Sequence, residues 1–600
     1  MITFVTAIYE EARPFIEILG LKKRSDEYQY QHFVSDGYEV VIVGEGHVSA
    51  LRNCSRHFAL HEPDNSSLVV NVGICGSSFG NIGDLYLINK ITDDSTGRTY
   101  YPDLVYKNSF EQHGITTVLA PKSSGEGLFD MESSMIYEGC VPYFTLERMI
   151  FFKVISDVFD GVDVLDKKLE PYKLINMHAQ KIIDFCKNVS FIKRNHSMGD
   201  VYLDNERIIP HLTESMSNQL KRTVYYRQLN GMDTLIDFDE GKWIETRSKA
   251  GRKKIFETKL KDLKKTSDLN YTRISRLKGL NLPYTNVYIE KGIEPPFKCK
   301  NIIWIDSYKD IFNRNHQNFD IQKRSPALIL SKQRGQFIYE GSKVCQNFGN
   351  EHFYYCSCLM NCIFDCDYCY LCGMYPTGNV VAFMNFDDIL KEIDEILAKH
   401  PMYLCVSYDT DLLASELMFG YVKKFIEATK IRKDLTIEIR TKTGNPLMFS
   451  NLEPSDQVIF AWTLSPEKVA KIETKAAPLR KRLAAIKSCS DRGFKIRICF
   501  DPMIYYKDWE RDYFYLVEDV FATIPAESVY DVSIGVFRIS SDYLKLMRKR
   551  RPDTPVVAFP FEAENGVSHY GELSYEMIYK MKQKVREYLP DDKIFLWGEE

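Results

Sequence analysis

The sequence lacks any long hydrophobic run. No stretch of the 600 residues approaches the roughly 18 consecutive apolar residues that a transmembrane helix requires, so a membrane span is excluded. The beginning of the chain also lacks the basic segment of a secretory signal, and residues 1–7 already have the pattern of a strand. Because 15 cysteines without a secretory signal are typical of a reducing compartment, we expect a cytoplasmic protein.

The sequence also lacks an excess of either charge. Its 78 Lys and Arg residues and 82 Asp and Glu residues leave a net charge of -4 at pH 7. Affinity for nucleic acid depends largely on Lys and Arg contacts to phosphates, so any contact with DNA must come from a local basic patch. Internal repeats and long low-complexity linkers are absent as well. The hydrophobic content of 44% is enough for the cores of several domains.

Three cysteines lie close together in one short segment. Cys362, Cys366 and Cys369 have the spacing C-x3-C-x2-C. Three thiolates at this spacing can hold three irons of a 4Fe-4S cluster and leave the fourth iron open for a cofactor or substrate. This arrangement is typical of radical S-adenosylmethionine chemistry. There the open iron chelates the methionine part of the cofactor, and one electron breaks the sulfonium bond to give a 5'-deoxyadenosyl radical.

A structural zinc site is the alternative interpretation of these cysteines. Cys356, Cys358 and Cys372 lie near enough in the sequence to complete a set of four ligands. Zinc sites usually take two ligand pairs separated by a dozen or more residues, whereas these thiols all fall within 17 positions. The spacing favours the cluster. A non-catalytic DNA-lesion binding protein with a structural metal loop stays open as the opposing hypothesis.

Further motifs surround the cysteine loop. They are Tyr370-Leu371 directly after it, the segments 404–411 and 437–442, and the segment 500–505 leading to Trp509-Glu510. With these motifs, residues from about 284 to 597 resemble spore photoproduct lyase, the radical S-adenosylmethionine enzyme that reverts a thymine dimer in spore DNA. The resemblance implies a partial (β/α) barrel with its site at the C-terminal strand ends. It also implies a 4Fe-4S cluster, S-adenosyl-L-methionine, a DNA partner, and a reductant such as flavodoxin or ferredoxin.

The resemblance implies roles for individual residues. Cys362, Cys366 and Cys369 correspond to the cluster ligands. Lys442 corresponds to the lysine that holds the cofactor carboxylate, and Thr410 and Thr463 correspond to hydroxyl groups that contact the cofactor. The tyrosines that relay a hydrogen atom in the family correspond to Tyr368 and Tyr370.

Two positions depart from the family. Tyr408 stands three residues before Asp411, where the family has a hydrogen-donating cysteine. If 404–411 is a strand, Cys405 faces away from Tyr408 and does not replace that cysteine. The family's arginine-tyrosine pair near the lesion corresponds to His569-Tyr570. The molecule that the radical attacks is therefore open: a pyrimidine dimer in DNA is favoured, and a modified RNA base or a protein side chain are the alternatives.

The N-terminal part begins with an apolar strand, and a second strand at 67–76 runs into glycines, as in a parallel α/β sheet whose backbone approaches a ligand. The residues that carry chemistry follow in the order Glu11, Met131-Glu132 and Ser156-Asp157. In this order, residues 1–188 resemble the purine nucleosidase and phosphorylase superfamily, in the branch that cleaves methylthioadenosine and S-adenosylhomocysteine. The resemblance implies a three-layer α/β domain, a small nucleoside as the partner, and a possible homodimer through this domain.

The same resemblance assigns a role to each of these residues. Met131 corresponds to the methionine under the ribose, and Glu132 to the glutamate that accepts its two hydroxyls. Ser156 and Asp157 correspond to the serine and the aspartate that donates a proton to purine N7, while Glu11 corresponds to the carboxylate that activates water. N-glycosidic cleavage passes through an oxocarbenium-like state, so it needs an acid for the departing base and a carboxylate that deprotonates water.

Departures from this family concern the nucleophile and the 5' pocket. Asn71 stands where phosphorylases carry an arginine for phosphate, so water is the expected nucleophile. Ile74 replaces a polar residue, and the segment between 94 and 130 is shorter than in the family. A degenerate domain kept only for dimerisation is the alternative.

The region between the two parts is predicted to be a mostly helical connector. A helical pattern at 176–186 closes the first domain, which gives domains at 1–188, 189–283 and 284–600. The connector contains one basic run, with Lys or Arg at 249, 252, 253, 254, 259, 261, 264 and 265. This run is mixed with acidic residues, which favours a solvated face over a surface that tracks phosphates.

The pairing of the two parts suggests a bifunctional enzyme. Cleavage of S-adenosylmethionine releases methionine and 5'-deoxyadenosine, and the latter resembles methylthioadenosine without its 5' sulfur. This product occupies the cofactor's own site and inhibits turnover. We expect the nucleosidase to hydrolyse it, or a related adenosine thioether, to adenine and a sugar.

Overall fold

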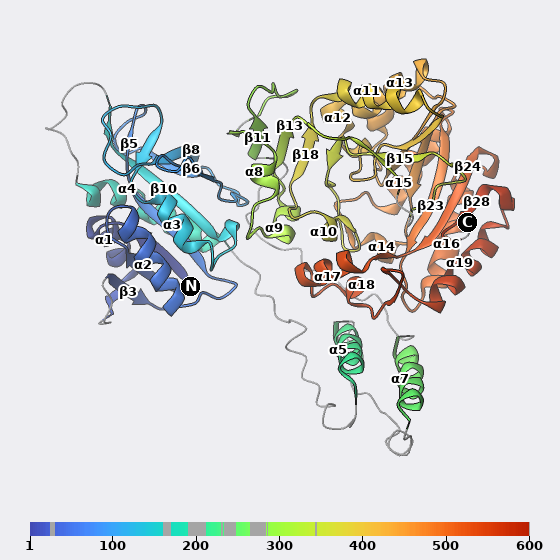
Figure 1. The fold of residues 1–600 in the computed structure, drawn as a ribbon, viewed down its shortest axis with the longest axis horizontal. Helices are drawn as coiled ribbons and strands as arrows, with labels where there is room; N and C mark the ends of the chain where they lie inside the picture. Colours follow the sequence, from blue (N-terminus) through green and yellow to red (C-terminus); the bar gives the residue numbers. More distant parts are fainter. Residues whose placement is uncertain are drawn as a thin grey trace.

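The computed structural model describes residues 1–24, 30–159, 170–189, 212–229, 232, 248–264, 284, 286–299, 301–341 and 345–598. In these residues an N-terminal part, blue to cyan in Figure 1, lies beside a larger C-terminal part, green to red. Most of the predicted connector lies outside the described residues, Lys265 included. No described helix combines the length and the apolar composition needed to cross a bilayer.

The N-terminal part is built on one mixed sheet. Its described strands are β1 (Ile2–Thr6), β2 (Lys22–Lys23), β3 (Gln31–Ser35), β4 (Tyr38–Ile42), β5 (Leu68–Ser77), β6 (Leu85–Asp93), β7 (Thr99–Tyr100), β8 (Glu111–Thr117), β9 (Leu128–Asp130) and β10 (Met149–Val158). β5 is the apolar strand predicted at 67–76, and it pairs in parallel with β1 on one side and β10 on the other. Because β10 also pairs with β6, the strands β5, β10, β6, β8 and β9 close into a ring.

Helices cover both faces of this sheet. They are α1 (Tyr9–Leu19), α2 (His47–Leu60), α3 (Ser133–Cys140) and α4 (Pro171–Asn188), with the short 3-10 helix η1 (Leu146–Arg148) before β10. On one face α1 and α4 contact each other, and Phe15 shares a core with Phe4 of β1. On the other face α2 and α3 contact each other, and Phe58 shares a second core with Val41 and Phe151. Two cores on opposite faces confirm the predicted three-layer α/β domain.

Two described helices belong to the predicted connector, α5 (Glu214–Leu229) and α7 (Lys249–Lys264). Their apolar sides face each other, because Leu220 and Val224 of α5 form one core with Phe256 and Leu260 of α7. The basic run therefore lies on an amphipathic helix. Lys253 in this helix pairs with Glu257, as expected for a solvated face.

The C-terminal part begins with a sheet of five described strands. In spatial order they are β12 (Asn301–Ile305), β11 (Asn286–Glu290), β13 (Leu328–Ser331), β18 (Val380–Phe383) and β16 (Leu359–Met360). All neighbours are parallel except β16, which runs antiparallel to β18. The short helices α8 (Lys309–Phe312) and α9 (Phe319–Arg324) lie between β12 and β13 in the chain. Figure 1 shows that this sheet faces the N-terminal part.

The second C-terminal sheet has eight described strands. In spatial order they are β14 (Ile338–Glu340), β15 (Phe353–Cys356), β19 (Met402–Cys405), β20 (Leu435–Thr441), β21 (Val458–Thr463), β23 (Lys495–Met503), β24 (Val529–Val536) and β28 (Ile594–Leu596). From β15 to β28 every neighbouring pair is parallel, so the carboxyl ends of these strands lie at one edge. Parallel strands in chain order with helical crossovers confirm the predicted partial (β/α) barrel.

The crossovers of this sheet are mostly helical. The described helices are α10 (Leu371–Met374), α11 (Phe386–Leu397), α12 (Glu416–Phe419), α13 (Tyr421–Ile431), α14 (Glu467–Ala470), α15 (Leu479–Ser490), α16 (Trp509–Thr523), α17 (Ser541–Arg550), α18 (Pro555–Ala558) and α19 (Glu572–Val585). The 3-10 helices are η4 (Leu413–Ser415), η5 (Pro446–Phe449), η6 (Ala526–Ser528) and η7 (Asp591–Lys593). Two short ladders complete the part, β17 (Asp365–Cys366) with β22 (Glu473–Thr474), and β25 (Ile539–Ser540) with β27 (Val567–His569) and β26 (Glu562–Glu564).

Buried polar contacts join the two parts of the chain. The guanidinium of Arg314, after α8, pairs with the carboxylate of Asp103 at 2.5 Å, and both side chains are buried. Gln322 of α9 donates to the same carboxylate at 2.7 Å. The backbone N–H of Leu146 donates to the carbonyl of His316 at 3.1 Å. The N-terminal domain is therefore docked on the sheet that begins the C-terminal part.

Candidate active sites

The three predicted cluster cysteines lie in one loop of the C-terminal part. Cys362 follows β16, Cys366 ends β17, and Cys369 lies in the turn before α10. The N–H of Cys369 donates to the carbonyl of Cys366 at 3.1 Å, and the N–H of Phe364 donates to Sγ of Cys362 at 3.4 Å. Burial raises the pKa of Cys362 to about 11, against the opposing charge of Lys323, and Cys369 adds to the increase. Cys369 and Cys362 also add to the increase that burial causes in the pKa of Cys366, so the three thiols lie close enough to affect one another.

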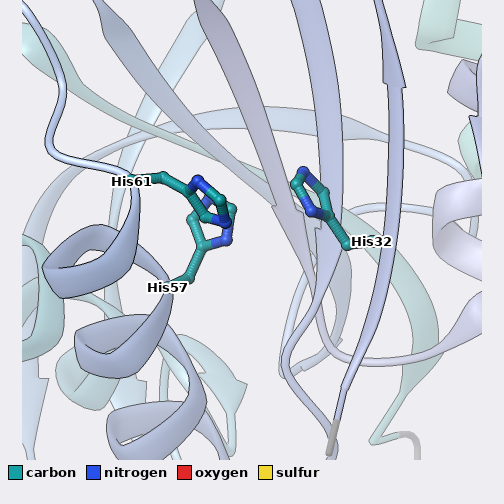
Figure 2. A group of neighbouring side chains, drawn as sticks. All are labelled: His32, His57 and His61. Carbon is teal, nitrogen blue, oxygen red and sulfur yellow. The ribbon is translucent and has the colours of Figure 1, made fainter. Parts of the chain in front are cut away.

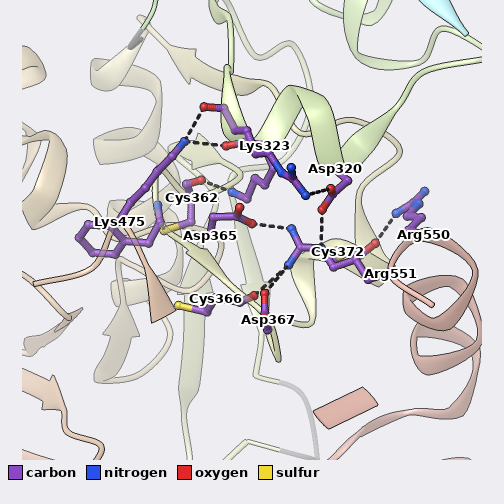
Figure 3. Close-up of polar contacts among 12 residues, drawn as sticks. Asp320, Lys323, Cys362, Asp365, Cys366, Asp367, Cys372, Lys475, Arg550 and Arg551 are labelled. Carbon is purple, nitrogen blue, oxygen red and sulfur yellow. Dashed lines mark hydrogen bonds and ion pairs between the residues drawn. The ribbon is translucent and has the colours of Figure 1, made fainter. Parts of the chain in front are cut away.

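Charged side chains from two other segments, α9 and the end of α17, hold this loop in place (Figure 3). The buried Arg551 donates to the carboxylate of Asp365 at 2.5 Å and to the carbonyl of Cys366 at 3.2 Å. It also pairs with Asp320 of α9 at 3.3 Å. On the other side of the loop, Lys323 of α9 donates to the carbonyl of Cys362. The cysteines therefore stand on a preformed, ion-paired support.

Two of the spare cysteines of the zinc interpretation lie before β16 in the chain. Cys356 ends β15, Cys358 lies two positions further on, and both are buried in the apolar core, as is Cys366. Sγ of Cys358 lies 3.9 Å from the carbonyl oxygen of Val406. The choice between one zinc ion and a multi-iron cluster therefore rests on the ligand spacing in the sequence.

The residues predicted to contact the cofactor lie at the carboxyl ends of β19, β20 and β21. Lys442 directly follows β20, and its N–H donates to the buried carboxylate of Asp411 at 2.7 Å. Its ammonium lies 5.6 Å from the ring centre of Tyr368. Burial by itself would lower the pKa of Lys442, but the neighbouring Cys366 and Glu473 raise it. Thr410 precedes Asp411, and Thr463 ends β21, so these groups share the strand edge beside the cysteine loop.

Tyr368 is fixed by a buried acidic group. Its hydroxyl donates to the carboxylate of Glu473, which also pairs with Arg482 and accepts from Ser465 at 3.0 Å. Burial and the charge of Glu473 both raise the pKa of Tyr368 well above its usual range. Tyr368 is therefore a neutral phenol within a closed hydrogen-bond network.

Tyr408, the predicted departure from the family, contacts Tyr370 in a segment that is not the predicted strand. The predicted strand at 404–411 is wrong beyond Cys405: β19 ends there and residues 406–411 form a turn. The reason is that the side chain of Ser407 accepts the N–H of Arg440 at 2.5 Å, so it takes over the hydrogen bonding that a strand would supply. Tyr370 donates to the carbonyl of Tyr408 at 2.6 Å.

Sequence reasoning missed Cys345, which contacts Tyr408. Its Sγ lies 3.5 Å from the hydroxyl oxygen of Tyr408, and the thiol is half-buried. The ring of Tyr408 is stacked on Tyr355 at 4.2 Å between centres and lies 5.7 Å from the ring of Tyr370. Cys405, by contrast, is buried beside Glu438. A contact across 63 sequence positions leaves no pattern that sequence analysis could use.

The predicted lesion residue Tyr570 is buried. It is 5% exposed, its hydroxyl accepts the N–H of Tyr505 at 3.2 Å, and its ring packs against Phe559 at 4.9 Å. Tyr226 of α5 covers this group, with its ring 5.3 Å from that of Phe559. The adjacent His569 is also buried and accepts the N–H of Gly571. A connector helix thus packs over the predicted lesion-binding position.

The N-terminal candidate site lies where α1, β5 and β10 meet. Glu11 is 3% exposed, and its carboxylate accepts the N–H groups of Ala7 at 2.9 Å and Ile74 at 2.9 Å. Burial raises the pKa of Glu11, while Lys153 opposes the increase. Lys153 of β10 is itself buried and pairs with Asp130 at 2.8 Å. Lys153 had no predicted role, because only the fold shows which carboxylates it contacts.

The structure brings Glu132 to the same cluster of charges. Glu132 lies just after β9 with Met131, and its Oε1 accepts the N–H of Gly46 at 2.8 Å. Burial raises the pKa of Glu132 to about 7, with Lys153 opposing and Asp130 contributing. A carboxylate held by a backbone N–H at one end keeps its second oxygen for a ligand, as a ribose-binding group requires.

Ser156 and Asp157 lie near the end of β10, beside β5. The hydroxyl of Ser156 donates to Asp157 at 2.6 Å and contacts the carbonyl of Cys75 at 3.1 Å. A β-carbon at Gly76 would lie 2.9 Å from Oδ2 of Asp157, and one at Gly73 would lie 3.0 Å from Nζ of Lys153. The glycines of β5 therefore make room for these charged side chains.

The structure also places the residues that depart from the nucleosidase family. Asn71 is buried, and its amide donates to the carbonyl of Val5 at 3.0 Å, which makes it a structural residue of the sheet. The N–H of Ile74 donates to Glu11, and its partly buried side chain packs against the neighbouring core. Among the described residues, Lys153 is the cation held within this cluster, and its ammonium is neutralised by Asp130.

Comparison with known proteins finds one matching family model and several similar solved structures. Residues 350–594 match the family described as Spore photoproduct lyase. A solved spore photoproduct lyase complexed with dinucleoside spore photoproduct is 16% identical, covers 52% of this chain and 98% of that chain, and has a TM-score of 0.43. A variant of that enzyme with bound AdoMet and dinucleoside spore photoproduct is 16% identical over 53% of this chain and 99% of that chain, with a TM-score of 0.42.

The N-terminal part has its own structural relatives. The Arabidopsis thaliana 5'-methylthioadenosine nucleosidase in apo form is 17% identical, covers 33% of this chain and 98% of that chain, and has a TM-score of 0.27. A search of curated proteins found no match. The family match confirms the predicted resemblance of the C-terminal part to spore photoproduct lyase, and a nucleosidase is among the solved structures to which the chain is similar.

Proposed function

We propose that this chain is a two-site enzyme. Its C-terminal part is a radical S-adenosylmethionine lyase that acts on a pyrimidine lesion in DNA, and its N-terminal part hydrolyses the 5'-deoxyadenosine that the first site releases. The observation that carries the proposal is that one chain holds both a supported three-thiol loop at the strand ends of a partial barrel and a Glu11, Glu132 and Asp157 site. The family match over 350–594 supports the lesion as the substrate class.

In this proposal Cys362, Cys366 and Cys369 hold a 4Fe-4S cluster, and Lys442 pairs with the carboxylate of S-adenosyl-L-methionine. The bound pair would supply a 5'-deoxyadenosyl radical after one electron from a flavodoxin- or ferredoxin-type reductant. The hydroxyls of Thr410 and Thr463 orient the cofactor at the same strand edge. The ion pairs of Arg551 keep the loop in one conformation, so that the thiols need little reorganisation to bind.

Cys345 and Tyr408 would return a hydrogen atom to the substrate. The O–H bond of Tyr408 breaks as a C–H bond forms on the substrate radical, and the S–H bond of Cys345 then breaks to restore the phenol. One electron from the reductant and one proton restore the thiol. In this way Cys345, whose Sγ lies 3.5 Å from the hydroxyl of Tyr408, provides the thiol that the family carries at the position of Tyr408.

The N-terminal residues divide the work of hydrolysis. Glu11 takes a proton from water as the oxygen attacks C1' of the ribose, and Asp157 gives a proton to N7 as the bond between C1' and N9 breaks. Glu132 accepts the ribose hydroxyls, and Lys153 limits the charge repulsion among the three neighbouring carboxylates Glu11, Asp130 and Glu132. The products are adenine and 5-deoxyribose.

The cluster assignment is tested by removing single thiols. Cys366→Ala should abolish release of 5'-deoxyadenosine from S-adenosylmethionine and lower the iron content, whereas Cys356→Ala, which changes a buried core thiol, should retain both. Wild-type release by the Cys366→Ala chain, or a colourless wild type with stoichiometric zinc in this loop, would reject it. If the enzyme converts an RNA base or a peptide and not a DNA dinucleoside photoproduct, the assignment of the radical site stands and the DNA lesion is rejected as its substrate.

A further inference from the structure

Three histidines meet at one corner of the N-terminal domain, remote from the proposed ribose site. His32 lies on β3, His57 lies in the last turn of α2, and His61 follows that helix (Figure 2). The chain offers one ligand nitrogen from each, and these atoms all lie within 4.8 Å of one another. His57 and His61 are four residues apart, which places both on one side of the helix end.

The spacing of the three rings matches that of a metal site. The ring centres of His32 and His57 are 4.9 Å apart, those of His57 and His61 are 5.0 Å apart, and those of His32 and His61 are 5.5 Å apart. An imidazole nitrogen about 2.0–2.1 Å from zinc puts the ring centre about 3.2 Å from the ion, so rings in tetrahedral positions have centres about 5.2 Å apart. The observed separations fall around this value.

A buried carboxylate completes the cluster. Glu39 of β4 is 8% exposed, and its oxygens lie 3.0 Å from Nε2 of His32 and 3.3 Å from Nε2 of His57. The hydroxyl of Thr3 donates to the same carboxylate at 2.5 Å. The other ring nitrogen of His57, Nδ1, lies 3.2 Å from the hydroxyl of Tyr30, which an ion bound to that nitrogen would displace. Histidine ligands of metals are usually oriented by such a carboxylate, which also offsets the charge of a divalent ion.

The site is separate from the proposed nucleosidase chemistry. The N-terminal end of α2 contacts Glu132 through the N–H of Gly46, whereas His57 and His61 lie at the opposite end. A helix of 14 residues spans about 21 Å, so an ion there would not reach the nucleoside. His32 and His57 are fully buried and His61 is half-buried, which leaves one side through which an ion can enter.

We propose that His32, His57 and His61 bind one divalent transition-metal ion, with Glu39 as the anionic partner of the site. Imidazole ligands suit zinc, and three of them with one water give the four-coordinate geometry that zinc prefers, while Glu39 orients the rings. The ion would tie the end of α2 to the β3–β4 hairpin at the edge of the sheet. It would therefore stabilise the N-terminal domain without taking part in hydrolysis.

The test is zinc binding by the full-length chain, measured as metal content after dialysis and by titration calorimetry. Wild type should hold one more zinc ion per chain than His61→Ala, and the control His178→Ala, a histidine of α4 in the same domain, should match wild type. Because all three chains carry the same cysteines, zinc held by thiols cancels in the comparison. Glu39→Gln should weaken binding by about 10–100-fold.

Two further measurements separate a metal site from a packing cluster. Cobalt added to wild type should give visible d–d bands that disappear in His61→Ala, with no accompanying change in the thiolate charge-transfer band. Zinc should raise the unfolding temperature of wild type more than that of His61→Gln, which keeps a polar side chain of similar length. Equal zinc content in wild type and His61→Ala, or cobalt bands unchanged by the substitution, would overturn the proposal.

Discussion

The thiol of Cys345 lies 3.5 Å from the hydroxyl of Tyr408, although 63 positions separate the two residues in the chain. Tyr408 occupies the position at which spore photoproduct lyases, by the resemblance, carry a hydrogen-donating cysteine. The chain therefore has a phenol at that position and a thiol directly behind it. In the proposed mechanism, Tyr408 faces the substrate and Cys345 supplies the sulfur-bound hydrogen behind it.

Replacing Cys345 tests this arrangement. Cys345→Ser should leave methionine release unchanged, because the cluster loop is untouched, but should lower the yield of repaired dinucleoside per methionine released. In heavy water, wild-type product should acquire deuterium from the exchangeable thiol and phenol, and this label should fall in the variant. Cys299→Ser, another half-buried thiol, is the control. An unchanged yield and label in Cys345→Ser would remove Cys345 from the mechanism.

Replacing Arg551 tests the support of the cysteine loop. Its guanidinium meets Asp365, Asp320 and the carbonyl of Cys366, all from other segments. Removal of one partner of a buried ion pair costs about 3–5 kcal/mol, so Arg551→Ala should lower the free energy of unfolding by that amount and reduce iron retention. The exposed Lys549→Ala on α17 should change stability by at most about 0.5 kcal/mol. Urea unfolding and iron analysis check both, and equal effects of the two variants would contradict the assignment.

The pKa of Glu132 predicts how nucleoside cleavage depends on pH. Burial raises this pKa to about 7, so the carboxylate becomes protonated as the pH falls through about 7 and can no longer accept two ribose hydroxyls. We expect kcat/KM for adenine release to fall on the acidic side of pH 7, mainly through a higher KM. Glu132→Gln should raise KM at every pH, and KM should then no longer depend on pH across pH 7. A KM that is flat across pH 7 in wild type would place the ribose elsewhere.

The buried pair Asp103–Arg314 predicts how firmly the two parts are joined. Asp103→Ala leaves Arg314 buried without its carboxylate, so it should cost about 3–5 kcal/mol and expose the junction to limited proteolysis. Asp94→Ala removes one partner of an exposed pair with Lys122 and should cost about 0–1 kcal/mol. Equal protease resistance of wild type and Asp103→Ala would show that other contacts determine the docking.

Local sequence patterns predicted the elements that position both sites. The apolar run of β5 and its glycines, and the spacing of Cys362, Cys366 and Cys369, are features of contiguous residues, so they can be recognised before folding is known. The prediction of a strand at 404–411, with Cys405 and Tyr408 on opposite sides, was wrong after Cys405. The strand ends there because the side chain of Ser407 takes over a backbone hydrogen bond.

Contacts between distant segments could not be predicted in this way. Lys153 is a β-strand residue like its neighbours until the fold places it beside Asp130 and Glu11. The same holds for Tyr226 over Phe559, and for His32, which meets His57 only through the pairing of β3 with β4 beside α2. Such groups are defined by topology, and no spacing in the sequence encodes them.

The central claim is that the product of the C-terminal site is consumed by the N-terminal site. Its most direct test is to follow methionine, 5'-deoxyadenosine and adenine together by chromatography, with reduced enzyme and S-adenosylmethionine. Wild type should release adenine in step with methionine, while Asp157→Asn, which loses general acid catalysis worth about 10²–10⁴-fold, should accumulate 5'-deoxyadenosine and stall until a separate nucleosidase is added. Wild-type enzyme that accumulates 5'-deoxyadenosine and releases no adenine would contradict the account.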